Sequence, residues 1–317
     1  MALELIAFES PARDWNAAQT SFFDRCKSLN LSPCTLGYYF HRLKAFREYL
    51  DVNTPGTTPA EVTANLVRAY VGWEAKERSP STANHTIVSL KALYNHLRRE
   101  GFVETNPLDA VEKVRCKQKV IPTFTTAQVE AVLNACGKDF RGIRDRAIIM
   151  TLLDCGLRVS ELTGLCLADI DWNDQTLLIL GKGNKERVVP FGQAAKQALM
   201  AYTGRRGELP TSALFVNAYG DPLTRFRVGR IIAGRCMDAG ITGVRCSPHT
   251  FRHTFAVQYL RNGGDVFSLQ KMLGHSDLMM TRRYAELSST DVLEKHRQYS
   301  PGDSLNVRGA GGRKRIK

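Results

Sequence analysis

Apolar residues recur every three or four positions through residues 15–100, which is the spacing of one face of an α-helix. Four amphipathic stretches follow one another: WNAAQTSFFDRCKSL, TLGYYFHRLKAFREYL, TPAEVTANLVRAYVGWEAKE and STANHTIVSLKALYNHLRREG. Thr58 and Glu61 have the spacing of a capping box and predict that the third helix begins there, while Gly101 predicts the end of the fourth. The pattern therefore predicts a small domain of four helices over residues 13–104.

The period is interrupted at residues 105–123, which we interpret as an interdomain linker. Pro107 suits the first turn of a short helix, and Pro122 ends the stretch. Beyond it, Thr125 and Gln128 predict a second capping box, and the apolar stretch RGIRDRAIIMTLLDCG predicts a helix that Gly156 terminates. LRVSELTGL then begins another helix.

The stretch QTLLILGKGNKERVVPFG has the character of two strands around a glycine-rich turn, which predicts a β-hairpin. Five further helices are predicted near residues 193–203, 223–238, 248–262, 265–273 and 277–287. The expected fold is mainly α, with a four-helix domain followed by a mostly helical α+β domain over residues 124–300 that contains a small antiparallel sheet. Residues 301–317 are rich in glycine and basic residues, and we predict a disordered tail there.

The charge is unevenly distributed along the 317 residues. The formal net charge is +13, yet residues 1–110 contain 12 basic and 12 acidic side chains, so the surplus lies in residues 111–317. This asymmetry favours a polyanionic partner for the C-terminal part, although charge alone leaves a merely basic soluble protein equally open. The basic cluster of the linker then either is solvated or contacts DNA. Its members are Lys113, Arg115, Lys117 and Lys119.

The eight cysteines form no C-x-x-C pair, and several lie in apolar runs. They are typical of buried free thiols in a reducing cytosol and not of a disulfide framework or a zinc site. The sequence begins without the basic and apolar regions of a signal peptide, and no apolar run approaches the ~20 residues of a membrane span. We therefore expect a cytoplasmic protein without a membrane partner.

Cationic and imidazole side chains gather at predicted helix starts, where the positive end of a helix dipole would repel them unless an anion binds. Arg158 opens one such helix, with Glu161 three residues on. In SPHTFRHTFA, Ser247 and Pro248 predict a helix start, and His249 and Arg252 follow on one face. Taken alone, the first arrangement is more typical of a surface ion pair than of an anion site. His253 adds a spacing that metal ligands use, but no third ligand accompanies it, so we predict no metal site.

The stretch GHSDLMMTRRY repeats the arrangement, with His275 before a predicted helix start and Tyr284 two turns later. The hairpin turn supplies Lys182 and Lys185. Taken singly, the tyrosine is typical of half-buried packing and the lysines of a solvated loop. Together with the two arginines, however, these residues indicate a site that handles phosphate.

Four blocks, CGLRVSEL, GKGNKERVVP, SPHTFRHTFA and GHSDLMMTRRY, resemble the signature blocks of the tyrosine recombinase (phage integrase) family and are most similar to simple Xer-type recombinases. The N-terminal helical domain resembles the family's core-binding (SAM-like) domain in size and place. The resemblance implies that Tyr284 attacks a scissile DNA phosphate, that Arg158 and Arg252 hold its nonbridging oxygens, and that Lys182 is the general acid for the departing 5′ oxygen.

The resemblance also implies that His249 acts in proton transfer, that His275 hydrogen-bonds to the phosphate, and that Glu161 has a supporting role. Fixed guanidinium and ammonium groups can stabilise the charge that develops on the phosphate, so no metal or cofactor is expected. A covalent 3′-phosphotyrosine keeps the bond energy, and rejoining then needs no ATP. The expected activity is site-specific recombination, in which strands are exchanged between two duplex sites.

Two other functions remain open at this point. A type IB topoisomerase-like enzyme would use the same tyrosine chemistry without pairing two sites, and a catalytically idle DNA-binding protein would need none of it. The family resemblance implies double-stranded DNA with short inverted core sites as the partner, and a homo-tetramer or paired recombinase in which TDVLEKHRQYS docks on a neighbour. The short segment before the first helix predicts no arm-site domain. Integration of a mobile element and resolution of chromosome dimers are both compatible with the sequence.

Overall fold

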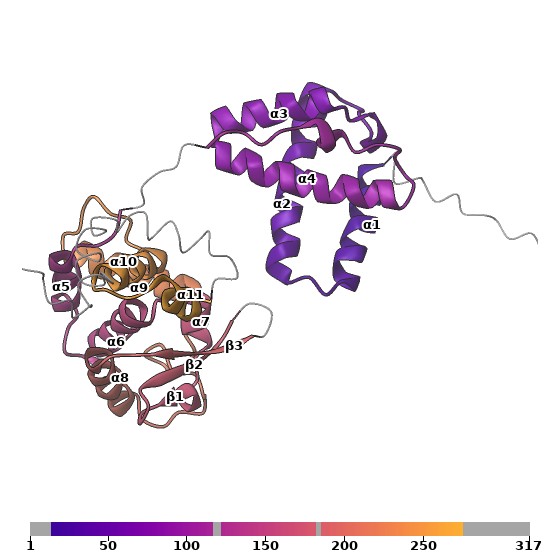
Figure 1. The fold of residues 1–317 in the computed structure, drawn as a ribbon. Coiled ribbons are helices and arrows are strands. Elements are labelled where there is room, and N and C mark those ends of the chain that lie inside the picture. The colour runs from indigo at the N-terminus through magenta and orange to yellow at the C-terminus, as the bar shows by residue number, and fades with distance from the viewer. Residues whose placement is uncertain (1–13, 117–121, 182–184, 275–317) are drawn as a thin grey trace, which may run out of the picture. The chain divides into compact units, whose positions relative to one another are not determined.

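The computed structural model describes residues 14–116, 122–181 and 185–274. The chain divides into two compact units, Met1–Lys119 and Val120–Lys317, each with its own hydrophobic core (Figure 1). Among the described helices, none is long and apolar enough to cross a membrane. All eight cysteines are free, and the expectation of burial fails for Cys34 and Cys116, which are exposed.

The described part of the first unit folds into four α-helices, as the apolar spacing predicts: α1 (Trp15–Ser28), α2 (Pro33–Asn53), α3 (Ala64–Glu77) and α4 (Pro80–Arg99). Each begins at a side chain that accepts a hydrogen bond from a first-turn amide; these caps are Asp14, Ser32, Thr63 and Ser79. Gly101, at φ 76°, adopts the left-handed conformation just beyond α4. Aromatic side chains pack within a largely aliphatic core, where Phe46 and Tyr70 meet edge to face.

The predicted start of the third helix is wrong by five residues, because its N-cap is Thr63 and not Thr58. The capping box of Thr58 and Glu61 is present, but it closes a separate 3₁₀ turn, η1 (Pro59–Glu61). Val62 then takes an extended conformation, and Thr63 caps α3 anew. Val62 is buried in the helical core, so the extended residue between the two helical segments packs against the rest of the unit.

The first part of the predicted linker belongs to the helical unit. Residues Pro107–Ala110 form a 3₁₀ helix, η2, and Leu108 is buried in the core of the first unit. The side-chain amide of Asn84 on α4 holds the chain beyond η2. Its Oδ1 accepts from the Val114 amide at 2.8 Å, and its Nδ2 donates to the Val114 carbonyl at 2.9 Å. Apolar burial therefore extends the unit past residue 105.

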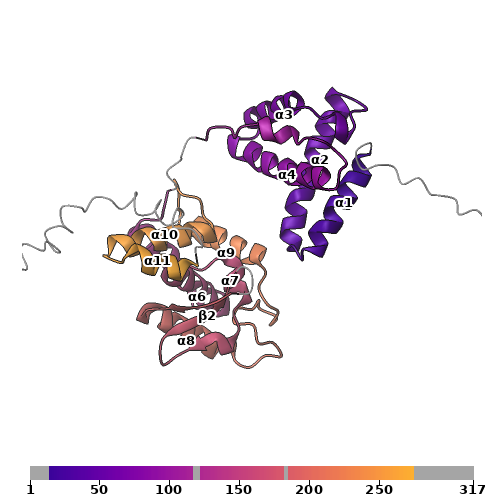
Figure 2. The same ribbon diagram turned by 45° about the vertical axis from the view of Figure 1, so that its right-hand side comes forward.

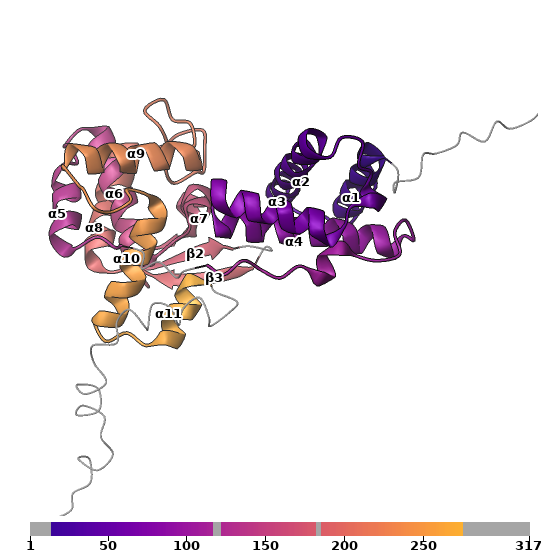
Figure 3. The same ribbon diagram turned by 90° about the horizontal axis from the view of Figure 1, so that it is seen from above.

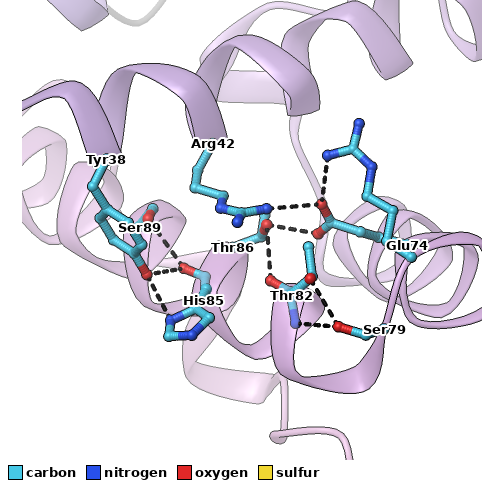
Figure 4. Close-up of polar contacts among 9 residues, drawn as sticks. Tyr38, Arg42, Glu74, Ser79, Thr82, His85, Thr86 and Ser89 are labelled. Atoms are coloured by element: carbon cyan, nitrogen blue, oxygen red, sulfur yellow. Dashed lines mark hydrogen bonds and ion pairs between the residues drawn. The ribbon is translucent and has the colours of Figure 1, made fainter. Parts of the chain in front are cut away.

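A buried carboxylate links three of the four helices in the first unit (Figure 4). Glu74 of α3 accepts a hydrogen bond of 2.6 Å from the Thr86 hydroxyl on α4. It also pairs with Arg42 of α2 at 3.5 Å and with Arg78 at 3.4 Å. Because a buried charge is costly unless it is paired, this network specifies how α2, α3 and α4 pack.

The second unit is mostly helical, with a small sheet. Its described elements are α5 (Thr126–Asn134), α6 (Phe140–Cys155), α7 (Val159–Gly164), η3 (Leu167–Asp169), β1 (Ile170–Asp171), β2 (Thr176–Leu180), β3 (Glu186–Pro190), α8 (Gln193–Arg206), α9 (Arg225–Asp238), α10 (Pro248–Arg261) and α11 (Val266–Leu273). The four helices predicted between residues 193 and 273 lie within three residues of these bounds. The helix predicted at 277–287 and the predicted tail lie outside the described residues.

The predicted hairpin is confirmed as β2 and β3, which pair antiparallel with Leu178 opposite Val188. Strand β1 pairs with β2 on the other side and was not predicted, because two residues are too few to show a period. Helix α6 packs between α8 and α10 (Figure 2), and α11 lies beside β3 (Figure 3). The mainly α fold class with a small antiparallel sheet is thus confirmed.

Candidate active site

A left-handed glycine places the first predicted arginine. Gly156, at φ 60° and ψ 30°, caps α6, and a Cβ at this position would collide with the ring of Phe255. Two residues later, Arg158 is the N-cap of α7, and its amide donates to Glu161 Oε2 at 2.7 Å. The turn therefore brings the Arg158 guanidinium and the Glu161 carboxylate together at the start of α7, as their spacing predicts.

The carboxylate of Glu161 lies at the centre of an arginine cluster. Its side chain is 4% exposed and accepts from Arg158 Nη1 at 2.8 Å. Arg187 of β3 donates to both carboxylate oxygens, from Nη1 to Oε1 at 2.9 Å and from Nη2 to Oε2 at 2.8 Å. Burial alone would raise the pKa of Glu161, but the hydrogen bonds from Arg187 and Arg158 lower it below its ordinary value.

Helix α10 brings the second predicted arginine to the same carboxylate. Ser247 caps the helix and Pro248 occupies its first turn, as the sequence predicts. The Arg252 side chain is 6% exposed and lies 3.9 Å from Glu161 Oε2. Its Nη1 donates to the Gly156 carbonyl at 2.6 Å, so α10 is tied to the end of α6.

His249 lies one turn before Arg252, with its side chain exposed to solvent. Partial desolvation and the positive charges of Arg252, Arg245 and Arg158 lower the pKa of this imidazole. The neutral form therefore prevails at pH 7, and a neutral imidazole can accept a proton.

The C-terminal end of α11 accepts a hydrogen bond from each arginine of the cluster. Arg187 Nε donates to the Met272 carbonyl at 2.9 Å, Arg252 Nη2 to the Leu273 carbonyl at 2.7 Å, and Arg158 Nη2 to the Gly274 carbonyl at 3.3 Å. These carbonyls form the negative end of a helix dipole, which attracts cations. The arginines thus fix the helix that ends immediately before His275 in the sequence.

Three of the six predicted site residues fall within the described part of the chain, and the fold brings these three together: Arg158, His249 and Arg252. The other three, Lys182, His275 and Tyr284, lie outside the described residues. Sequence reasoning missed Arg187. The alternation of the strand could have revealed it, because Arg187 is on the same side of β3 as the buried Val189 and opposite the buried Ile179. A charged side chain on that buried side needs a partner, since an unpaired buried charge is costly.

Comparison with known proteins agrees with this arrangement. Residues 122–290 match the phage integrase family, and residues 25–101 match the N-terminal SAM-like domain of phage integrases. The chain belongs to the phage integrase family. This integrase is 34% identical over 279 residues to the tyrosine recombinase XerC of Pelobacter propionicus, with 86% of the chain and 91% of the relative covered. It is a tyrosine-type site-specific recombinase.

Solved integrase structures share its fold. A lambda integrase dimer bound to a COC′ core site is 18% identical, with a TM-score of 0.71 over 85% of this chain and 76% of the other. A lambda integrase tetramer bound to a Holliday junction is also 18% identical, with a TM-score of 0.70 over 83% of this chain and 77% of the other. At this identity the likeness establishes the fold of the recombinase.

Proposed function

We propose that this recombinase cleaves and rejoins DNA through a covalent 3′-phosphotyrosine at Tyr284. The supporting observation is the arginine cluster, in which three guanidiniums share one carboxylate, an excess of two positive charges. Such fixed charge suits the phosphate of a DNA backbone, which gains negative charge on its oxygens in the transition state. Planar guanidiniums also match phosphate oxygens in pairs.

The family resemblance gives each residue of the site its proposed role. Arg158 and Arg252 hold the nonbridging oxygens of the scissile phosphate, and His275 hydrogen-bonds to the same group. Tyr284 is the nucleophile. Its phenol has an ordinary pKa of about 10 and needs help to lose its proton at neutral pH.

The cleavage step exchanges one phosphoester bond for another. The Tyr284 oxygen attacks phosphorus as its proton passes to the neutral imidazole of His249, and a phosphotyrosine bond forms. The bond from phosphorus to the 5′ oxygen breaks, and Lys182 protonates that oxygen. A 5′ hydroxyl of another strand reverses these steps. Both directions conserve the number of ester bonds, so we propose that ATP is not required. We also propose that the fixed charges of the arginines and Lys182 stabilise the phosphate without a metal ion.

The proposed partner is double-stranded DNA carrying short inverted core sites, bound by a homo-tetramer or a paired recombinase. In this proposal residues 13–104, together with the first part of residues 105–123 that packs on them, form a DNA-binding domain, residues 124–300 form the catalytic domain, and the rest of residues 105–123 links the two. The basic tail over residues 301–317 would reach the DNA backbone through its charge.

Replacement of the phenol tests the nucleophile. With a nicked duplex from which the cleaved 5′ fragment diffuses away, Tyr284→Phe should abolish the covalent protein–DNA adduct seen on a denaturing gel. Affinity for the same duplex should change less than about threefold, because the phenol oxygen alone is lost. An adduct that persists in Tyr284→Phe would place the nucleophile elsewhere in the chain.

A second experiment separates recombination from relaxation by a topoisomerase-like activity. Two differently labelled duplexes carrying the same core site should yield recombinant products, and yield should be unchanged in EDTA without ATP. If the protein relaxes supercoiled DNA but yields no recombinant products from paired core sites, strand exchange is contradicted. Loss of the adduct in EDTA would contradict the metal-independent step.

A further inference from the structure

Arg187 joins three segments of the recombinase site. It lies on β3, the second strand of the hairpin whose turn carries Lys182. Its two terminal nitrogens bind Glu161 on α7, and its Nε binds the Met272 carbonyl on α11. The side chain is 14% exposed, between Arg252 at 6% and Arg158 at 34%.

This geometry suits Arg187 for positioning. Each of its three nitrogens donates a hydrogen bond within the protein: the two terminal nitrogens to Glu161 and Nε to the Met272 carbonyl. Because the guanidinium is planar, these bonds fix the angle between the two partners. Glu161 belongs to α7, which begins at Arg158, and Met272 belongs to α11, which precedes His275 in the sequence. Arg187 is therefore the described side chain through which the hairpin is anchored to both arms of the site.

Within the described residues, the hairpin near its turn is otherwise held by strand pairing and by the Gly181 amide, which donates to the Lys185 carbonyl at 2.8 Å. Strands β2 and β3 contain five residues each, and the last strand pair before the turn joins Leu180 with Glu186. Ile179, opposite Arg187, is buried, but the exposed fractions of Leu180 and Val188 are 56% and 59%, so burial does not hold the end of the hairpin beyond Ile179. Strand β1 pairs with β2 only at Thr176 and Leu177, so the sheet is two-stranded near the turn, and a short two-stranded ribbon is only marginally stable by itself.

We propose that Arg187 positions Lys182 for proton donation to the departing 5′ oxygen, by anchoring the hairpin to Glu161 and to the end of α11. This rests on the proposed role of Lys182 as general acid. Loss of the anchor would increase the freedom of the hairpin turn and lower the fraction of time that the ammonium group is within reach of the leaving oxygen.

A change of leaving group provides the test. In a suicide duplex with sulfur in place of the 5′-bridging oxygen, the leaving group is a thiolate, which departs without protonation. Arg187→Met should slow single-turnover cleavage of the oxygen substrate about 100-fold, the scale of general acid catalysis. On the sulfur substrate the same variant should come within about tenfold of the wild-type rate.

Three reference variants make the result specific. Lys182→Ala should show the same rescue by sulfur, while Arg158→Ala, which loses a phosphate contact, should be slow on both substrates. Lys185→Met removes a positive charge from the same hairpin without the Glu161 contact, and its ratio of oxygen to sulfur rates should equal that of wild type. Adding Arg187→Met to Lys182→Ala should cause no further loss on the oxygen substrate.

The ratio of the two rates is independent of the fraction of correctly folded enzyme, so a partly misfolded variant remains informative. Arg187→Lys, which keeps the charge but not the fork, should show the same selective defect. If Arg187→Met is slowed equally on both substrates while sulfur still rescues Lys182→Ala, the positioning role of Arg187 is wrong and the general acid assignment of Lys182 stands. Failure of sulfur to rescue Lys182→Ala would overturn the general acid assignment and this inference with it.

Discussion

The Glu161 carboxylate illustrates how one residue can organise a catalytic site. A buried negative charge is costly in a protein interior, and this one is compensated by hydrogen bonds from Arg158 and Arg187 and by the nearby Arg252. The same carboxylate lowers the mutual repulsion of three guanidiniums held close together. Glu161 therefore stabilises an arrangement of cations whose net charge still attracts a phosphate.

Substitution of this residue should affect stability and cleavage together. Glu161→Gln leaves three cations around a neutral amide, and we expect the free energy of unfolding of the second unit to fall by about 3 kcal/mol, measured by urea denaturation. Cleavage of a suicide duplex should fall in parallel. The exposed Glu186 on the same hairpin is the control, since Glu186→Gln should change stability by less than about 0.5 kcal/mol. Equal effects of the two substitutions would contradict the role of the cluster.

The lowered pKa of His249 predicts how cleavage depends on pH. The imidazole is neutral above its folded pKa and gains a proton only as the pH falls through that value, which lies below the ordinary value of about 6.5. At subsaturating DNA, titration of His249 should therefore leave the cleavage rate unchanged between about pH 7 and 8, and the rate should fall at lower pH as the imidazole gains a proton. His249→Gln should be slow and lack this acidic limb. An unchanged profile in the variant would assign the limb to another group.

At the scale of elements, the ends of α6 and α11 carry the site. Both helices end in a left-handed glycine, Gly156 and Gly274, and the carbonyls of these turns accept hydrogen bonds from the arginines. Helix ends expose carbonyl groups that lack partners within the helix, so the cations satisfy them while the helices hold the cations in place. The proposed phosphate-binding arginines are in this way held by backbone carbonyls at helix ends.

A methyl group at the end of α6 should disturb this support. Gly156→Ala must accept a positive φ and displace Phe255, and we expect a loss of about 2 kcal/mol or more in the free energy of unfolding. Gly164, at the end of α7, has ordinary φ and open space around its Cα, so Gly164→Ala is the matched control and should be neutral or slightly stabilising. Thermal unfolding of both variants measures the difference. Similar melting temperatures would show that the turn tolerates a side chain.

At the scale of the whole molecule, the positive charge surplus lies in residues 111–317, while residues 1–110 are balanced. A pocket lined by α6 and α9 lies outside the arginine cluster and is also basic. Its arginines include Arg141, Arg227 and Arg230. Such a distribution favours binding to a phosphate backbone through release of counterions.

Affinity for duplex DNA should accordingly fall steeply with salt. Between 50 and 200 mM NaCl we expect the Kd of the full chain to rise about 10³-fold, as for a protein that neutralises six or more phosphates. Tyr284→Phe is the form to measure, because it should not trap the DNA covalently. A Kd that changes less than about tenfold would indicate that few phosphates are contacted.

Local interactions account for what could be predicted without the fold. Helix periods, the caps at Ser247 and Thr125, and the glycine that terminates α6 involve residues within four positions of one another, so the sequence shows them directly. The pairing of Arg158 with Glu161 is of the same kind. The predicted start of the third helix was wrong because the capping box at Thr58 closes only a short 3₁₀ turn, and a second cap at Thr63 begins α3.

The sequence by itself determined the helical elements, the hairpin, the uneven charge and the four blocks that mark a recombinase. Only the tertiary structure decided that Arg187 binds Glu161, 26 residues away, and that Arg252 binds the Gly156 carbonyl, 96 residues away. The physical reason is that burial and charge compensation select partners by proximity in space. A strand residue and two helix ends meet only when the hydrophobic core has brought their elements together.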